Sequence, residues 1–224
     1  MTLRVDLGSS VVEVRCSTRA DGDFHVDGPR AELLACRKRF ADGVWTQLDE
    51  VHGTEVRVVT SPGEHDFAVG DALVTRLSGV VLGAWVGDCA PVVLISDGGT
   101  IAAAHAGWKG ALDGVLPATL AAMGGDPSSV HAYLGPCIHP CCYEFGADDL
   151  ARFVDRFGPT VVGRTTWGTA ALDLPRVVQL SLAEAGVAVT DIGGCTGCDE
   201  RWFSHRRRGE AGRQVMTVCK RARS

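Results

Sequence analysis

The chain has 224 residues, of which 46% are hydrophobic, and its formal net charge is −5. This length and apolar content predict one globular domain, residues 1–224, with a sizeable core. The net charge argues against non-specific nucleic-acid binding, and no apolar run reaches the ~18 residues of a membrane span. The first residues also lack the apolar segment of a signal peptide, so we expect a soluble, cytoplasmic protein without a nucleic-acid or membrane partner.

Apolar periodicity and turn residues predict strands interleaved with helices. In chain order we expect a strand at 11–16, a helix at 29–40, strands at 55–59, 72–75, 80–86, 92–96 and 101–104, a helix at 110–123, a strand at 132–134, helices at 148–157 and 175–185, and a strand at 215–219. The alternation has no strict βαβ rhythm, and no G-x-G-x-x-G motif follows the first strand. The pattern therefore favours a mixed-sheet α/β or α+β domain.

Three short segments each place a metal ligand or proton carrier beside a turn-forming residue. They contain His52 before Gly53, Cys89 at the turn between two strands, and His105 at a strand end. Each residue alone has an ordinary interpretation, since a buried cysteine or a core histidine is common. Together they offer two imidazoles and a thiolate, a set that leaves one tetrahedral position open on zinc, as catalytic sites do.

Other polar residues are weaker candidates. Arg37, Arg206 and Arg207 belong to basic runs that are either solvated or suited to clamping phosphate. Asp88 is either a turn residue or a group that orients a ligand or carries a proton. His205 is a further candidate for the same pocket.

The nine cysteines argue against a complete disulfide framework, because the number is odd. Cys195-x-x-Cys198 could in principle form a Cys₄ zinc site with two of Cys137, Cys141 and Cys142. Only one C-x-x-C pair is present, so the sequence favours free or buried thiols.

The sequence resembles the YfiH-like, or multicopper polyphenol oxidase (laccase-domain), family, also described as peptidoglycan editing factors and purine nucleoside phosphorylases. The resemblance rests on ordered motifs from residue 51 to the C-terminus. They are VHGTEV (51–56), DALVT (71–75), DCAPV (88–92), AHAGWKG (104–110), LGPCI (134–138) with YE (143–144), CT (195–196), FSHRR (203–207) and GRQ (212–214).

This resemblance implies a mixed β-sandwich flanked by helices, similar to bacterial toxin deamidases, and a single YfiH-like domain over residues 1–224. It implies that His52, Cys89 and His105 bind zinc, or copper. It also implies phosphorolysis of adenosine, inosine, guanosine and methylthioadenosine, and deamination of adenosine. The loop at 17–23 is shorter than in relatives, where it shapes the pocket, and Glu50 stands where glutamine is usual.

The leading hypothesis is a zinc-dependent purine nucleoside enzyme with Cys89, His105 and Asp88 in the catalytic site, acting on a small-molecule nucleoside and phosphate. Three alternatives stay open. They are a copper polyphenol oxidase, a metal-free Cys89/His105 hydrolase that edits peptidoglycan precursors, and a non-catalytic metal-binding module. The sequence does not indicate an oligomeric state.

Overall fold

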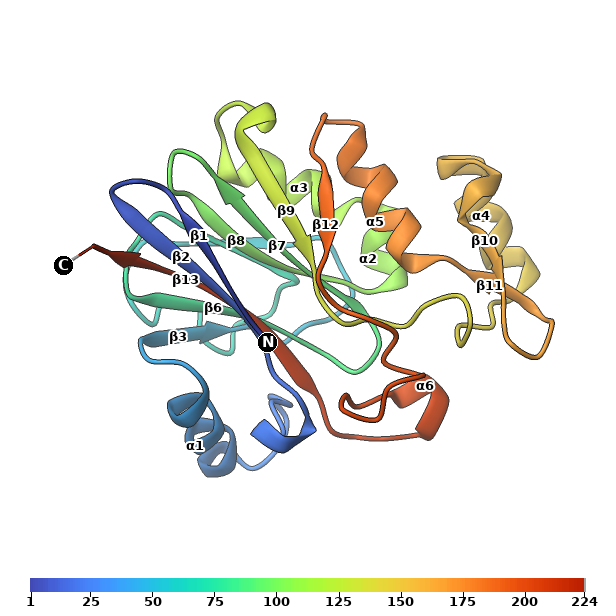
Figure 1. Ribbon diagram of the computed structural model, residues 1–224, viewed down its shortest axis with the longest axis horizontal. Coiled ribbons are helices and arrows are strands. Elements are labelled where there is room, and N and C mark those ends of the chain that lie inside the picture. The colour runs from blue at the N-terminus through green and yellow to red at the C-terminus, as the bar shows by residue number, and fades with distance from the viewer. Residues whose placement is uncertain (224) are drawn as a thin grey trace.

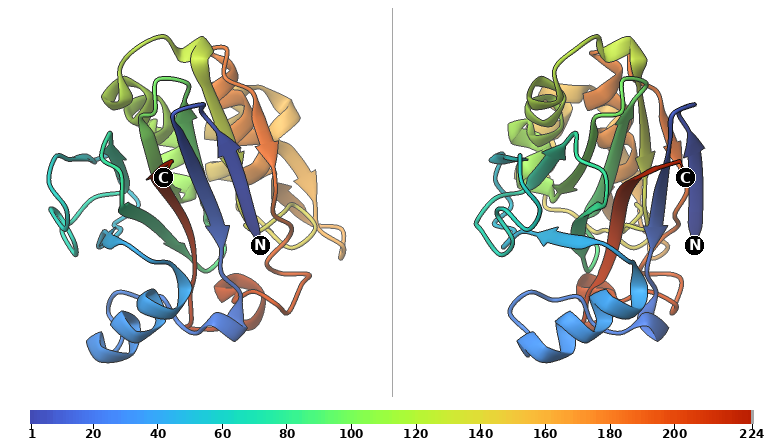
Figure 2. Two further views of the ribbon diagram at one scale, coloured as in Figure 1. Left: turned by 60° about the vertical axis from the view of Figure 1, so that its left-hand side comes forward. Right: turned by 90° about the vertical axis from the view of Figure 1, so that its left-hand side faces the viewer.

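A computed structural model describes residues 1–223, and its centre is a pair of mixed β-sheets stacked face to face (Figures 1 and 2). The five-stranded sheet has the order β1 (Thr2–Asp6), β2 (Ser10–Cys16), β13 (Gln214–Ala222), β6 (Val80–Val86), β3 (Val44–Gln47). The six-stranded sheet has the order β12 (Val189–Asp191), β9 (Val130–Leu134), β7 (Ala90–Ser96), β8 (Ile101–Ala106), β5 (Ala72–Thr75), β4 (Val56–Val59). A separate hairpin pairs β10 (Val162–Arg164) with β11 (Ala170–Leu172).

The inner faces of the two sheets share one apolar core. Val14 and Met216 of the five-stranded sheet belong to the same buried cluster as Val93 and Ile101 of the six-stranded sheet. Strands β6, β7 and β8 are buried along their whole length, because both of their faces are covered. This explains why their sequences are continuous apolar runs, whereas β2 alternates between buried and half-buried residues.

Helices cover the two outer faces (Figure 1). The outer face of the six-stranded sheet packs against α2 (Trp108–Asp113), α3 (Val115–Met123), α4 (Ala147–Phe157) and α5 (Leu174–Ala183). The outer face of the five-stranded sheet packs against α1 (Arg30–Phe40). The short elements are α6 (His205–Arg208) and the 3₁₀ turns η1 (Arg19–Asp21), η2 (Pro127–Ser129) and η3 (Pro159–Val161). The expected α+β class, a mixed sandwich flanked by helices, is confirmed.

The structure corrects the expected elements in two ways. The single helix expected at 110–123 is two helices, because Gly114 adopts a left-handed conformation with φ of 100° and ends α2. The sequence also did not predict β1, β3, β10, β11, β12 and α6. These elements are short or lie at sheet edges, where exposed and charged residues weaken the apolar signal. Within the described residues, no helix combines the length and apolar character that crossing a membrane requires.

Candidate functional site

The two sheets bring the three predicted metal ligands together. His52 follows β3, Cys89 lies between β6 and β7, and His105 lies near the end of β8. Their donor atoms all lie within 4.8 Å of one another. Cys89 Sγ is 3.7 Å from His52 Nε2, and the two imidazole rings are 4.8 Å apart between centroids.

Glycines permit this close approach. A Cβ atom on Gly107 would lie 2.5 Å from His52 Cδ2 and 3.3 Å from Cys89 Sγ. A Cβ atom on Gly110 would lie 2.5 Å from the carbonyl oxygen of Gly53. The glycines of the HAGWKG and VHG motifs therefore fit these segments against each other, and His52 completes the turn with a φ of 61°.

Asp71, which begins the DALVT motif, orients both histidines. Its Oδ1 accepts hydrogen bonds from the backbone N–H of His52 at 2.8 Å and from His105 Nδ1 at 2.9 Å, and its Oδ2 accepts one from the N–H of Gly53 at 2.7 Å. Burial acts to raise the pKa of Asp71, but the contact with His105 lowers it below its usual value. A carboxylate on Nδ1 fixes the tautomer of His105 and leaves Nε2 as its metal-binding nitrogen.

Glu50 is a second carboxyl group beside His105. Its Oε1 accepts a hydrogen bond from the backbone N–H of Trp85 at 2.9 Å, and its Oε2 lies 3.6 Å from His105 Nδ1. Burial raises the pKa of Glu50 well above its usual value. Burial acts to lower the pKa of His105, but Glu50, Cys89 and Asp71 raise it well above the usual value.

The donor set fits a metal ion. Burial acts to raise the pKa of Cys89, but His105 and His52 lower it to about 6, so the sulfur is available as a thiolate. One thiolate and two imidazoles suit zinc or copper and leave a tetrahedral position for another ligand. The exposed His52 and the partly exposed Cys89 give solvent access to that position.

Asp88 holds a neighbouring loop. Its Oδ1 accepts hydrogen bonds from Thr196 Oγ1 at 2.6 Å and Ser204 Oγ at 2.7 Å, and its Oδ2 accepts one from the N–H of Arg206 at 2.6 Å. Burial raises the pKa of Asp88 although these hydrogen bonds act in the opposite direction. Both of its oxygens are engaged, so Asp88 ties the turn that carries Cys89 to the segment at 196–206.

A cavity of about 340 Å³ opens beside the three ligands. Trp85, Trp108 and Tyr143 contribute aromatic walls, and Arg206 and Arg213 contribute positive charge. The Arg206 guanidinium lies 4.9 Å from the centre of the Tyr143 ring. His205 also lines this cavity, as the sequence suggested.

The other two predicted phosphate ligands lie elsewhere. The buried Arg37 forms an ion pair with Asp66 at 2.9 Å, bonds Gln47 at 3.2 Å, and lines a separate cavity beside α1. Arg207 is exposed and lies over the ring of Trp167 at 5.2 Å. Of the three arginines, the structure brings only Arg206 to the cavity.

Sequence reasoning missed Asp71, Glu50, Arg213 and Tyr143 as residues of this site. Each stands inside or directly beside a motif that carries the resemblance, but no spacing relates it to the histidines. Asp71 reaches His105 because β5 and β8 are antiparallel neighbours, with Ala72 opposite Ala104. That pairing is a property of the sheet and leaves no local signal.

The comparisons with known proteins agree with this fold and site. Residues 15–221 match the family model described as multi-copper polyphenol oxidoreductase laccase. The chain belongs to this family.

Curated relatives share about a third of their sequence with the chain. A Corynebacterium glutamicum protein named purine nucleoside phosphorylase is 36% identical over 210 residues, covering 88% of this chain and 85% of its own. The Escherichia coli protein named purine nucleoside phosphorylase YfiH is 33% identical, covering 88% of this chain and 82% of its own.

Solved structures extend the similarity to the whole fold. A Neisseria meningitidis protein superposes with a TM-score of 0.83 at 25% identity, covering 99% of each chain. YlmD from Geobacillus stearothermophilus superposes with a TM-score of 0.78 at 26% identity, covering 96% of this chain and 93% of its own.

Proposed function

We propose that the chain is a zinc-dependent purine nucleoside phosphorylase that acts on adenosine, inosine, guanosine and methylthioadenosine. The observation that carries the proposal is the set His52, Cys89 and His105 at the edge of an aromatic and cationic cavity. Relatives named purine nucleoside phosphorylase cover most of the chain. We further propose that the chain acts in the cytoplasm as one domain, residues 1–224.

His52, Cys89 and His105 would hold the metal. Zinc supplies a Lewis acid and a nucleophile that is active at neutral pH when it is bound in such a site. Asp71 keeps the proton of His105 on Nδ1, so that Nε2 stays a neutral donor. Asp88 positions Cys89 by holding the segment at 196–206.

The cavity walls match a purine nucleoside and an anion. Trp85, Trp108 and Tyr143 offer aromatic surface for a flat purine base, since aromatic rings stack favourably. Arg206 and Arg213 offer guanidinium groups, whose geometry suits two oxygens of a phosphate. Phosphorolysis needs both partners side by side, because a phosphate oxygen forms a bond to C1′ of the ribose while the bond from C1′ to the purine nitrogen breaks. The leaving purine takes up a proton, and the products are a free base and ribose 1-phosphate.

Product analysis tests this function. Purified, zinc-loaded protein is incubated with adenosine and phosphate, and the products are identified by mass spectrometry beside a Cys89→Ala variant. Adenine with ribose 1-phosphate in the wild type alone supports phosphorolysis. Wild-type product no greater than that of the variant would reject it.

Adenosine deamination is a second candidate, favoured by the open coordination position beside the cavity. Inosine formed without phosphate would establish it in the same assay. Phenol oxidation with copper, amide cleavage of a peptidoglycan precursor and metal binding without catalysis are distinguished by parallel incubations and by metal analysis. A metal-free protein that hydrolyses the precursor would favour the Cys89/His105 hydrolase.

A further inference from the structure

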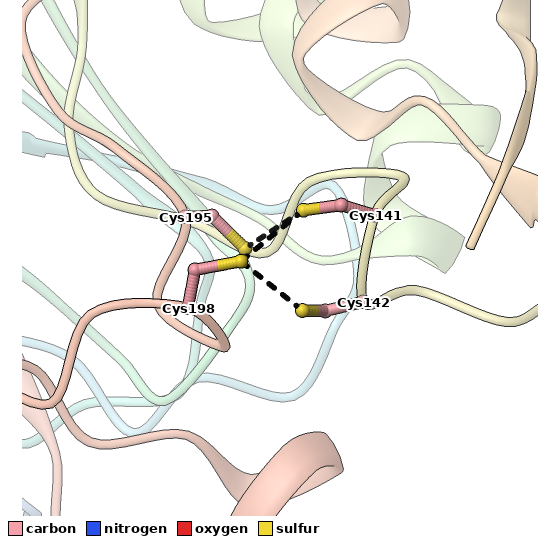
Figure 3. A group of neighbouring side chains, drawn as sticks. All are labelled: Cys141, Cys142, Cys195 and Cys198. Carbon is pink, nitrogen blue, oxygen red and sulfur yellow. Dashed lines mark hydrogen bonds between the residues drawn. The ribbon is translucent and has the colours of Figure 1, made fainter. Parts of the chain in front are cut away.

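A second cluster of metal-binding side chains lies outside the proposed active site. The sulfur atoms of Cys141, Cys142, Cys195 and Cys198 all lie within 4.8 Å of one another. Figure 3 shows the four side chains pointing toward a common centre from two separate loops. Cys198 Sγ is 3.4 Å from the sulfur atoms of both Cys141 and Cys142, and Cys195 Sγ is 3.6 Å from that of Cys141.

Sheet topology explains the convergence. Strands β9 and β12 are parallel neighbours, with Ala132 opposite Val189 and Leu134 opposite Asp191. The chain therefore leaves both strands at the same edge of the sheet. A further bridge joins Cys137 to Cys195 beyond the strands, so the turn with Cys141 and the C-x-x-C loop start side by side.

The sulfur spacing matches one tetrahedral metal ion. A Zn–S distance of about 2.3 Å places the sulfur atoms of a tetrathiolate site about 3.8 Å apart. The observed separations of 3.4 to 3.6 Å are close to this value. They are much longer than the roughly 2.05 Å of a disulfide bond. We propose that these four cysteines bind a structural zinc ion, in addition to the metal at His52, Cys89 and His105.

The surroundings of the cluster suit a tetrathiolate. The backbone N–H of His139 donates to Cys195 Sγ at 3.4 Å, which supports a negative sulfur. A Cβ atom on Gly197 would lie 2.9 Å from Cys142 Sγ, so a glycine is needed where the two loops meet. Cys142 is buried and Cys198 is exposed, which leaves solvent access for a metal ion.

This second ion would join the turn at 139–142 to the segment at 193–208. That segment supplies Thr196, Ser204 and the N–H of Arg206 to Asp88, next to Cys89. A closed Cys₄ site contributes folding energy and has no open position for a substrate. Its role is therefore to fix one wall of the cavity.

Zinc content is the test, and it does not depend on any activity. Protein is purified under reducing conditions, and zinc per chain is measured for the wild type, Cys198→Ser, Cys89→Ala and the matched control Cys36→Ser. We expect two zinc ions in the wild type and in Cys36→Ser, because Cys36 lies on α1 away from both centres. We expect one zinc ion in Cys198→Ser and one in Cys89→Ala.

X-ray absorption at the zinc edge of Cys89→Ala identifies the ligands of the remaining ion. This variant retains all four cysteines, so the measurement stands even if Cys198→Ser fails to fold. Four sulfur atoms at about 2.3 Å and no nitrogen support the proposal. Nitrogen ligands, iron in place of zinc, or a disulfide among the four cysteines in reduced wild-type protein would overturn it.

Discussion

The molecule presents two clusters of thiol ligands that differ in what completes them. At the first cluster, Cys89 stands with two histidines, and a cavity of about 340 Å³ adjoins the ligands. At the second, four cysteines surround one point and supply a full tetrahedral set. The first arrangement leaves a position for a substrate, whereas the second serves only to hold two loops.

The supporting residues differ in the same way. Carboxyl groups surround the first cluster, since Asp71 and Glu50 both lie against His105. Such groups orient an imidazole and tune the metal that it binds. At the second cluster, a backbone N–H contacts Cys195, and a glycine lets the two loops meet. The comparison indicates a reactive centre and a structural one on the same chain.

Removing Cys89 gives the largest expected effect on activity. Cys89→Ala takes away the only thiolate of the open centre, so phosphorolysis should fall to the background of the assay. Cys36→Ser, which changes a buried cysteine on α1, should keep its activity. Initial rates with adenosine and phosphate measure both. Substantial activity in Cys89→Ala would show that the open centre is not the reactive one.

Asp71→Asn tests the carboxylate that supports the open centre. The change keeps the shape of the side chain but removes its charge from His105 Nδ1. Loss of such a partner typically costs about 10–100-fold in metal affinity or activity. We expect that reduction in kcat/KM, with a weaker zinc affinity in a competition titration. Asp126→Asn, at the η2 turn, is the control and should match the wild type.

Arg206→Gln tests phosphate binding in the cavity. A hydrogen bond to a charged group contributes about 1.5–3 kcal/mol, which corresponds to roughly a 10–100-fold change in binding. The KM for phosphate should rise by that factor while the KM for adenosine changes little. Arg152→Gln on α4 is the control, since Arg152 does not line the cavity. Equal effects on both substrates would contradict a phosphate-specific role.

Cys198→Ser should change stability more than activity. A ligand present at about 1,000 times its Kd stabilises the folded state by about 4 kcal/mol. For a chain of this size, about 2–4 °C of Tm accompanies each kcal/mol. Differential scanning calorimetry should therefore show a Tm lowered by roughly 8–16 °C, while kcat falls only several-fold. A Tm equal to that of the wild type would remove the structural role.

Sequence predicted the open centre better than the closed one, for a physical reason. His52, Cys89 and His105 each lie in a short motif with a glycine or proline, so local residues already mark their turns. Asp71 reaches His105 only through the pairing of β5 with β8. The four cysteines meet because β9 and β12 run parallel, and β12 was not predicted at all. Two adjacent cysteines and one C-x-x-C pair carry no local sign of that neighbourhood.

Predicted contacts of the charged residues depended on topology in the same way. Arg37 belongs to a basic run that resembles a phosphate clamp, yet α1 packs it against Asp66 and the aromatic cluster at Trp45. Arg206 reaches the cavity because its own N–H bonds Asp88. A run of arginines therefore predicts positive charge but not the cavity that the charge will face.

Anomalous diffraction at the zinc edge, from crystals of the protein purified without chelator, tests the central claim most directly. The account predicts two peaks, one among His52, Cys89 and His105 with an open side toward the cavity, and one at the centre of the four cysteines. A map without a peak at the His52, Cys89 and His105 centre would contradict it.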